Sequence, residues 1–228
     1  MRKINVIITG ATGMIGESVL DQCIKHRSID KILVINRRTS GLQHPKLIEV
    51  VLPDLSDASS LKDDLKDYDA CFFCIGVSSL GMDEATYTRL TYTLTMDFAK
   101  LLVEVNPAMT FCYISGAGTD SSEKGRTMWA RVKGKTENDL MKLPFKQVCN
   151  FRPGALIPYL KVKPNQTYQS VKYLKWLLLL LRPVFPKAIL RLSDFASAMI
   201  NSAFIESSDR VWILETKDIK DLSKRELG

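Results

Sequence analysis

Glycines at short intervals near the start of the chain are the residues best suited to chemistry. An apolar segment at 4–8 leads into the run TGATGMIG, which opens an amphipathic helix pattern. Gly10 permits a tight turn, Gly13 lets a diphosphate approach the backbone, and Gly16 lets the helix pack closely on the strand. The flanking strand and helix favour this interpretation over a glycine turn without a ligand. The candidate phosphate-binding residues are Thr9, Gly10, Thr12, Gly13, Met14, Ile15 and Gly16.

The residues about twenty positions after the glycines indicate which dinucleotide would bind. NAD sites usually place an acidic side chain there for the ribose 2′-hydroxyl, but this chain has Asn36 followed by Arg37 and Arg38. A guanidinium can bind a 2′-phosphate through two parallel hydrogen bonds, whereas a carboxylate would repel it. The sequence therefore predicts NADP(H), with a solvated arginine loop as the alternative.

Strand and helix patterns alternate along the chain, which predicts a parallel α/β sheet covered on both faces. Ligands bind beyond the carboxyl ends of such strands, so the glycine turn, residues 36–38, Asp54, Gly76 and Ser115 would converge on one crevice. A charged, surface-exposed tail is expected from Lys217. We expect further strands at 31–35, 47–52, 70–75, 110–115, 147–151 and 211–214, and helices at 60–67, 84–105, 127–141 and 193–204, the last capped by Ser193 or Asp194.

The composition of the whole chain suits one α/β domain, since 46% of its 228 residues are hydrophobic and 25% are charged. We expect a dinucleotide-binding core over 1–154, and a substrate cap with the last helix and strand over 155–228. The net charge of +7 suits phosphorylated ligands, but the basic residues are scattered and no nucleic-acid-binding motif is present. No secretion signal or membrane-length apolar run is visible, so we expect a cytoplasmic protein.

Three other features have both a structural and a functional interpretation. Cys71 and Cys74 stand three apart on a predicted strand, which favours core thiols over a shared metal, and no metal site is expected. The stretch 172–192 is apolar and basic, and packing over the pocket or core is favoured over contact with an anionic membrane or a partner protein. The helix at 84–105 could support a homodimer, or its apolar face serves only the core.

Several motifs stand in the order of a known superfamily. They are the glycine run, Asp54, Cys74-Ile75-Gly76, Ser115, Lys133 and Arg152-Pro153-Gly154, together with Ile35-Asn36-Arg37-Arg38 and Val132-Lys133-Gly134. Through them the sequence resembles the short-chain dehydrogenase/reductase superfamily over residues 3–154. It is most similar to the atypical group that includes the Tat-interacting protein and nucleoside-diphosphate-sugar epimerase-like proteins. The resemblance implies a Rossmann-type doubly wound parallel sheet with a small C-terminal substrate-side region.

The resemblance also implies a role for each matching residue. Asp54 would bind the adenine amino group, with a turn or helix cap as its alternative, and Gly76 would lie beside the adenine ribose. Ser115 would polarise a substrate carbonyl as a catalytic residue, and Lys133 would hold the nicotinamide ribose. The other implied cofactor contacts are Leu55, Cys74 and Ile75, with Pro153 and Gly154 shaping the nicotinamide end of the pocket.

One position departs from the superfamily's pattern of a tyrosine followed four residues later by a lysine. Here Trp129 precedes Lys133, and an indole N–H cannot act as a proton acid near neutral pH. Three alternatives stay open: another acid, a bound water relayed by Ser115 and Lys133, or cofactor binding without turnover. The tyrosines that could supply another acid are Tyr113, Tyr87, Tyr92 and Tyr159.

The function expected from these residues is that of an NADP(H)-dependent oxidoreductase acting on a small carbonyl or alcohol substrate. The alternative is a non-catalytic NADP(H)-binding regulator that docks a partner protein through residues 160–192. A sugar-nucleotide epimerase is less favoured, because it too normally needs the tyrosine and little chain follows residue 154 to build a sugar-nucleotide site.

Overall fold

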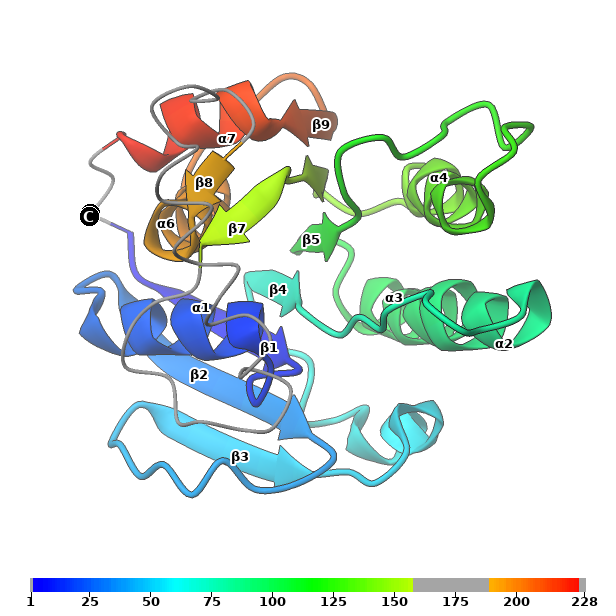
Figure 1. Ribbon diagram of the computed structural model, residues 1–228. Helices are drawn as coiled ribbons and strands as arrows, with labels where there is room; N and C mark the ends of the chain where they lie inside the picture. Colours follow the sequence, from blue (N-terminus) through cyan, green and yellow to red (C-terminus); the bar gives the residue numbers. More distant parts are fainter. Residues whose placement is uncertain (1, 158–188, 226–228) are drawn as a thin grey trace.

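The computed structural model describes residues 2–157 and 189–225, which fold around a seven-stranded parallel sheet (Figure 1). The strand order is β3-β2-β1-β4-β5-β6-β9, and every neighbouring pair runs parallel. A second, two-stranded parallel sheet pairs β7 with β8. The strands are β1 (Ile4–Thr9), β2 (Ile29–Asn36), β3 (Leu47–Val51), β4 (Ala70–Phe73), β5 (Thr110–Ile114), β6 (Gln147–Arg152), β7 (Ala155–Ile157), β8 (Ile189–Arg191) and β9 (Val211–Glu215).

Helices cover both faces of the large sheet, as a doubly wound fold requires. Helices α1 (Met14–Lys25), α6 (Leu192–Ser202) and α7 (Thr216–Ser223) share one apolar core with the sheet. Helix α3 (Leu94–Val105) packs in the core on the opposite face, beside α4 (Met128–Leu140) (Figure 1). The doubly wound α/β architecture predicted from the sequence is therefore confirmed. The division at residue 154 stays a prediction.

Packing explains the apolar run Val6-Ile7-Ile8 of the first strand. Val6 and Ile8 are buried in the core beneath α1, whereas Ile7 is buried in the core on the other face. Because both faces of a central parallel strand are covered, successive side chains are all apolar. The same packing places the carboxyl end of β1 in the middle of the sheet, between β2 and β4.

Two expected helices differ from the structure in position or geometry. The helix expected at 60–67 is instead a 3₁₀ helix at Leu55–Leu61, because Asp54 caps the chain earlier by accepting a hydrogen bond from the Ser56 amide. The helix expected at 84–105 is present, but it consists of α2 (Glu84–Thr88), a π-helical turn (Arg89–Thr93) and α3.

The C-terminal part also corrects two expectations. Helix α6 begins at Leu192 after Arg191, so neither Ser193 nor Asp194 caps it. The expected exposed tail after Lys217 forms α7, whose Ile219 and Leu222 are buried in the core. Their spacing of three residues is helical, but the surrounding charged residues hide it in the sequence. Residues 158–188 of the cap, including most of the apolar and basic stretch 172–192, lie outside the described residues.

The five cysteines are free thiols. Cys71 is buried in one core, whereas Cys74 packs against the other, which confirms that they point to opposite faces of the sheet. Burial raises the pKa of the Cys23, Cys71 and Cys149 thiols well above its ordinary value. These side chains behave as small apolar residues of the interior.

Candidate functional site

The glycine turn lies at the carboxyl end of β1, where the predicted crevice should be. Gly10 has a φ of +69°, and a Cβ there would lie 3.0 Å from the Cys74 carbonyl carbon and oxygen. A Cβ on Gly16 would lie 2.2 Å from the Gly10 carbonyl oxygen. The tight turn and the close packing of α1 on this turn are therefore both present, for the reasons that the sequence predicted.

The start of α1 offers hydrogen-bond donors at the same place. Gly13 precedes the helix in an extended conformation, and no side chain caps the first turn. Thr12 and Gly13 are exposed, while Met14 and Ile15 are half-buried. Helix N-termini without a side-chain cap suit an anionic ligand, because their N–H groups and dipole both favour negative charge.

The loop after β2 is tied directly to the glycine turn. The buried Asn36 side chain accepts a hydrogen bond of 2.9 Å from the Ala11 amide, which joins the two loops directly. Arg37 and Arg38, which follow it, are exposed. Within residues 2–157 and 189–225, neither guanidinium has an ion pair or a hydrogen bond to another side chain, and both are available to an anion.

Asp54 and Gly76, which were expected beside the adenine and its ribose, follow β3 and β4. Asp54 accepts a hydrogen bond of 2.9 Å from the Ser56 amide, which lowers the pKa of its carboxyl group. Asp54 is therefore a helix cap, which was its alternative interpretation, and its contact with adenine stays a prediction. Leu55 is buried, Cys74 and Ile75 are half-buried, and no atom lies within 4 Å of a Cβ placed on Gly76.

Thr9 adds a feature that the sequence did not explain. Its hydroxyl is fully buried at the end of β1 and has no hydrogen-bond partner within the described residues. Unpartnered buried hydroxyls are uncommon in proteins, since each costs desolvation free energy. Together with the crowded Gly10 and Gly16 and the open space at Gly76, this hydroxyl fits a site that receives a polar ligand at the end of β1.

Lys133 of α4 lies beside the carboxyl end of β5. Its ammonium group donates hydrogen bonds of 2.7 Å to the Ser115 carbonyl and 3.1 Å to the Ile114 carbonyl. Burial lowers the pKa of Lys133 to about 8, although the carboxylate of Glu137 opposes the shift. This lysine can therefore release a proton far more readily than an exposed one.

The Ser115 side chain points to a carboxylate that the sequence analysis missed. Its buried hydroxyl donates to Glu137 and lies 3.1 Å from the Phe151 carbonyl oxygen. The hydrogen that was expected to polarise a substrate carbonyl is thus directed to Glu137 in this structure. Glu137 stands four residues after Lys133 on the same helix face, which was the signal available in the sequence.

Glu137 is in turn neutralised by Arg152 at the end of β6. The carboxylate is fully buried, and the guanidinium Nε lies 3.1 Å and 3.2 Å from its two oxygens, with a further hydrogen bond from Nη2. Arg152 also donates to the Ser121 hydroxyl at 2.6 Å and to Glu215 at 3.3 Å. The buried pair therefore connects α4 with the ends of β5, β6 and β9.

The indole of Trp129 packs on the loop that follows β5. Its ring atoms lie 3.8 Å from a Cβ placed on Gly116 and 3.7 Å from one placed on Gly118. Pro153 and Gly154 bond to two different segments: the Pro153 carbonyl accepts from the Ala117 amide of this loop at 2.8 Å, and the Gly154 amide donates to Thr216 Oγ1 of α7 at 2.9 Å.

The described tyrosines are held in other roles. The Tyr113 hydroxyl is buried without a hydrogen-bond partner among the described residues, and burial raises the pKa of Tyr113 far above its ordinary value. Tyr92 donates to Asp139 at 2.8 Å, and Tyr87 is buried. Tyr159 lies outside the described residues. None of the three described phenols is thus an accessible proton acid of ordinary pKa.

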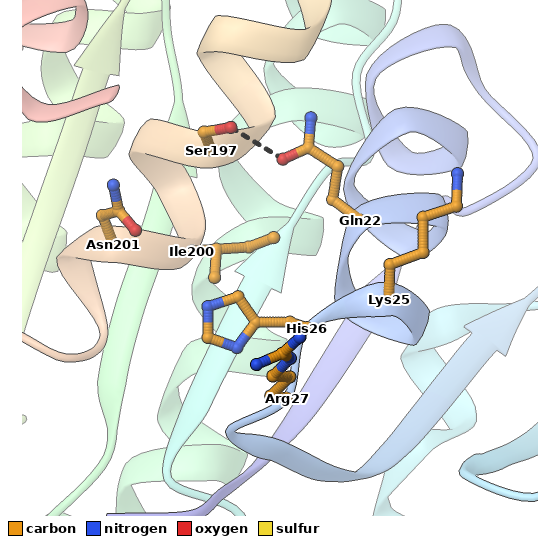
Figure 2. A pocket seen from close by; sticks show the side chains of 7 residues that line it. All are labelled: Gln22, Lys25, His26, Arg27, Ser197, Ile200 and Asn201. Atoms are coloured by element: carbon orange, nitrogen blue, oxygen red, sulfur yellow. Dashed lines mark hydrogen bonds between the residues drawn. The ribbon is translucent and has the colours of Figure 1, made fainter. Parts of the chain in front are cut away.

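A cavity of about 350 Å³ lies where the end of α1 meets α6, on the face of the sheet that these helices cover (Figure 2). Figure 2 shows the Ser197 hydroxyl bonded to Gln22 across this cavity, at 2.8 Å. Its basic residues are Lys25, His26 and Arg27. Lys25 already pairs with Asp21 at 2.6 Å, and the His26 ring stacks on Phe204. Among the described residues, no three His, Cys, Asp or Glu side chains gather as metal ligands.

The fold and the glycine turn define a Rossmann-type NAD(P)-binding protein of the short-chain dehydrogenase/reductase kind. A family model described as "NAD dependent epimerase/dehydratase family" matches residues 6–123. The chain belongs to this family.

Relatives and solved structures agree with that class. The chain is 26% identical over 152 residues to "Protein FMP52, mitochondrial" of Meyerozyma guilliermondii, which is 66% of this chain and 64% of that protein, slightly under two thirds. It is 25% identical to the Candida albicans protein of the same name, over 96% of this chain and 98% of that one.

The fold is similar to Bordetella bronchiseptica WbmF in complex with NAD+, with a TM-score of 0.70 and 12% identity over 97% and 77% of the two chains. It is also similar to MoeE5 in complex with UDP-glucose and NAD, with a TM-score of 0.68 and 15% identity over 96% and 80%.

The names of the relatives correct one expectation. The matching proteins from Meyerozyma, Emericella and Candida are all named mitochondrial. These names point to mitochondria, so the cytoplasmic location expected from the sequence is wrong. No described helix is long and apolar enough to cross a membrane.

Proposed function

We propose that the protein is an NADP(H)-dependent oxidoreductase that acts on a small carbonyl or alcohol substrate. The observation that carries the choice of NADP(H) is the exposed pair Arg37 and Arg38, which lacks any partner among the described residues and is tied through Asn36 to the glycine turn. The solved neighbours named above are complexes with NAD. The arginine pair is the reason to expect a 2′-phosphate here.

In the proposed reaction Lys133 moves the proton. When bound, the cofactor would supply a hydride for the carbonyl carbon. The ammonium group of Lys133 gives its proton to the carbonyl oxygen, which becomes the alcohol, and the resulting amine takes a proton from solvent. Two backbone carbonyls hold Nζ in place, and its pKa of about 8 keeps the ammonium form dominant at neutral pH while allowing release. Ser115 and Glu137 act as positioning residues for this end of the site.

A second candidate is a non-catalytic NADP(H)-binding regulator, which Trp129 favours because its indole stands where a phenol would be expected. The docking segment considered for it, residues 160–192, lies outside the described residues except for 189–192. A sugar-nucleotide epimerase is less favoured for the same lack of a phenol at position 129. Turnover separates these candidates from the oxidoreductase.

The cofactor assignment is tested by calorimetric titration of the purified protein with NADPH and with NADH. We expect NADPH to bind at least tenfold more tightly than NADH, and the double variant Arg37→Ala, Arg38→Ala to lose this preference. The Arg126→Ala variant is the control, because it removes an exposed arginine on the loop after β5. Equal affinities in the wild-type protein would exclude the NADP(H) proposal.

The reaction is tested by following NADPH absorbance with a panel of aldehydes and ketones. Reduction by the wild-type protein, with a loss of at least 100-fold in kcat for Lys133→Met, would support the proposed proton transfer. Tight NADPH binding with no reduction of any carbonyl would favour the regulator.

A further inference from the structure

We infer that Glu49 is a specificity-determining residue of the cofactor site: its carboxylate organises the loop that presents Arg37 and Arg38 to a 2′-phosphate. The inference rests on the proposed NADP(H) site. Glu49 belongs to β3, beside Val34 of β2, and lies thirteen residues after Asn36, where the loop begins. Nothing in a count of twenty residues from the glycines would find it.

The contacts of Glu49 converge on residues on both sides of the arginine pair. One carboxylate oxygen accepts from the Ser40 amide at 2.8 Å and from the Asn36 side-chain amide at 3.2 Å. The other oxygen accepts from the Thr39 hydroxyl at 2.6 Å. One side chain therefore clamps the loop before Arg37 and after Arg38, which fixes the backbone that carries both guanidinium groups.

The clamp continues into the glycine turn. Asn36 uses its amide nitrogen toward Glu49 and its amide oxygen toward the Ala11 N–H. A continuous chain of hydrogen bonds thus runs from β3, through the end of β2, to the loop expected to hold the diphosphate. This series of hydrogen bonds sets the distance between the groups that would bind the diphosphate and those that would bind the 2′-phosphate. Glu49 therefore affects cofactor binding without touching the cofactor.

The carboxylate of Glu49 is poorly suited to the alternative role of binding a ribose 2′-hydroxyl. Both oxygens already accept hydrogen bonds from the protein, with three donors in total. Burial raises the pKa of Glu49, but the hydrogen bonds from Thr39, Ser40 and Asn36 outweigh it and hold the pKa below its ordinary value. The side chain is therefore ionised at neutral pH, and its charge is used within the loop.

The direction of the change in NADPH affinity distinguishes the proposed role of Glu49 in ordering the loop from a purely electrostatic effect of its charge. Replacing Glu49 by glutamine removes a negative charge near the 2′-phosphate, which by Coulomb's law alone would strengthen binding of NADPH. Loss of the clamp would instead free the loop and weaken binding, because ordering the loop would then cost free energy at the binding step. We expect the second effect to dominate.

The test is calorimetric titration of wild-type, Glu49→Gln and Thr39→Val proteins with NADPH, NADH and adenosine 2′-monophosphate. For Glu49→Gln we expect Kd to rise about tenfold for NADPH and adenosine 2′-monophosphate, and less than twofold for NADH. Thr39→Val, which removes one exposed donor, should shift the same ligands in the same direction by about threefold. The matched control is Asp30→Asn at the other end of β2, whose carboxylate pairs with Lys3 at 2.8 Å.

Each other result has a definite meaning. Tighter NADPH binding with lost NADH binding in Glu49→Gln would show that the carboxylate binds the ribose, and would overturn the inference. Equal losses for NADPH and NADH, or no change for either, would overturn it as well. If the wild-type protein does not distinguish NADPH from NADH, the proposed function itself fails, and that result is visible before any variant is examined. Thermal unfolding of Thr39→Val and Glu49→Gln verifies that the variants are folded.

Discussion

At the scale of single residues, Gly16 of the glycine turn has no room for a side chain. The Gly16→Ala variant would place a methyl group 2.2 Å from the Gly10 carbonyl oxygen, so α1 must shift away from the turn. We expect a loss of about 1–3 kcal/mol in the free energy of unfolding and no measurable NADPH binding. Urea denaturation of Gly76→Ala is the comparison, because its new methyl group meets no atom within 4 Å. Equal stability of the two variants would contradict this view of the turn.

The lowered pKa of Lys133 predicts how folding stability depends on pH. Its pKa is near 10.5 in the unfolded chain and about 8 in the folded protein, so the unfolded state binds more protons between these values. The contribution of Lys133 to folding stability is therefore least favourable below pH 8 and improves as the pH rises toward 10.5. Denaturation of wild-type and Lys133→Met proteins from pH 7 to 10.5 measures it. A stability difference independent of pH would show that the lysine titrates normally.

The residues that the sequence missed share one physical property. Glu49 and Glu137 act through partners that are distant in sequence, at Asn36 and Ser115. A local pattern can place a glycine turn or an arginine pair, since turn geometry and cofactor charge depend on neighbouring residues. A buried carboxylate needs the register of the sheet to be known before its partner can be named. The glycine turn was therefore predictable from the local pattern, whereas Glu49, whose partners depend on the pairing of β2 with β3, was not.

At the scale of elements, the buried pair of Glu137 and Arg152 holds α4 against the ends of the strands. Arg152→Met would leave a fully buried carboxylate without its main partner, which we expect to cost about 3–5 kcal/mol of the free energy of unfolding. Adding Glu137→Gln to this variant should restore part of the loss. Glu215→Gln is the control: the Glu215 side chain is 51% exposed, so its loss should cost less than about 1 kcal/mol. Denaturation in urea gives all three values.

The helices and strands were predictable where packing requires a regular pattern of apolar residues in the sequence. Seven strand cores, those of β1–β6 and β9, were found because the strands of a parallel sheet covered on both faces are rich in apolar residues, as at Ile7 and its neighbours. Helix α7 was missed because only Ile219 and Leu222 mark its buried side. The 3₁₀ helix after Asp54 and the π-helical turn at Arg89–Thr93 depend on local hydrogen bonds that carry no periodic signal.

At the scale of the whole molecule, cofactor binding should appear as added thermal stability. A ligand at 100 times its Kd adds about 2.7 kcal/mol, which for a chain of this length is about 5–10 °C in Tm. We expect this shift for NADPH and a smaller one for NADH at equal concentration. Raising the salt concentration from 0.05 to 0.5 M should reduce the NADPH shift more, because ions screen the contact with Arg37 and Arg38. Differential scanning fluorimetry would reveal equal salt sensitivity if the arginines play no part.

The buried thiols can report which part of the folded sheet opens first. Cys23, Cys71 and Cys149 are distributed over α1, β4 and β6 and are buried from solvent, and their raised pKa values keep them in the unreactive thiol form. An alkylating reagent can therefore reach them only when the surrounding sheet separates. The order in which these positions acquire label, read by mass spectrometry, would show whether the sheet parts at its centre or peels from one edge.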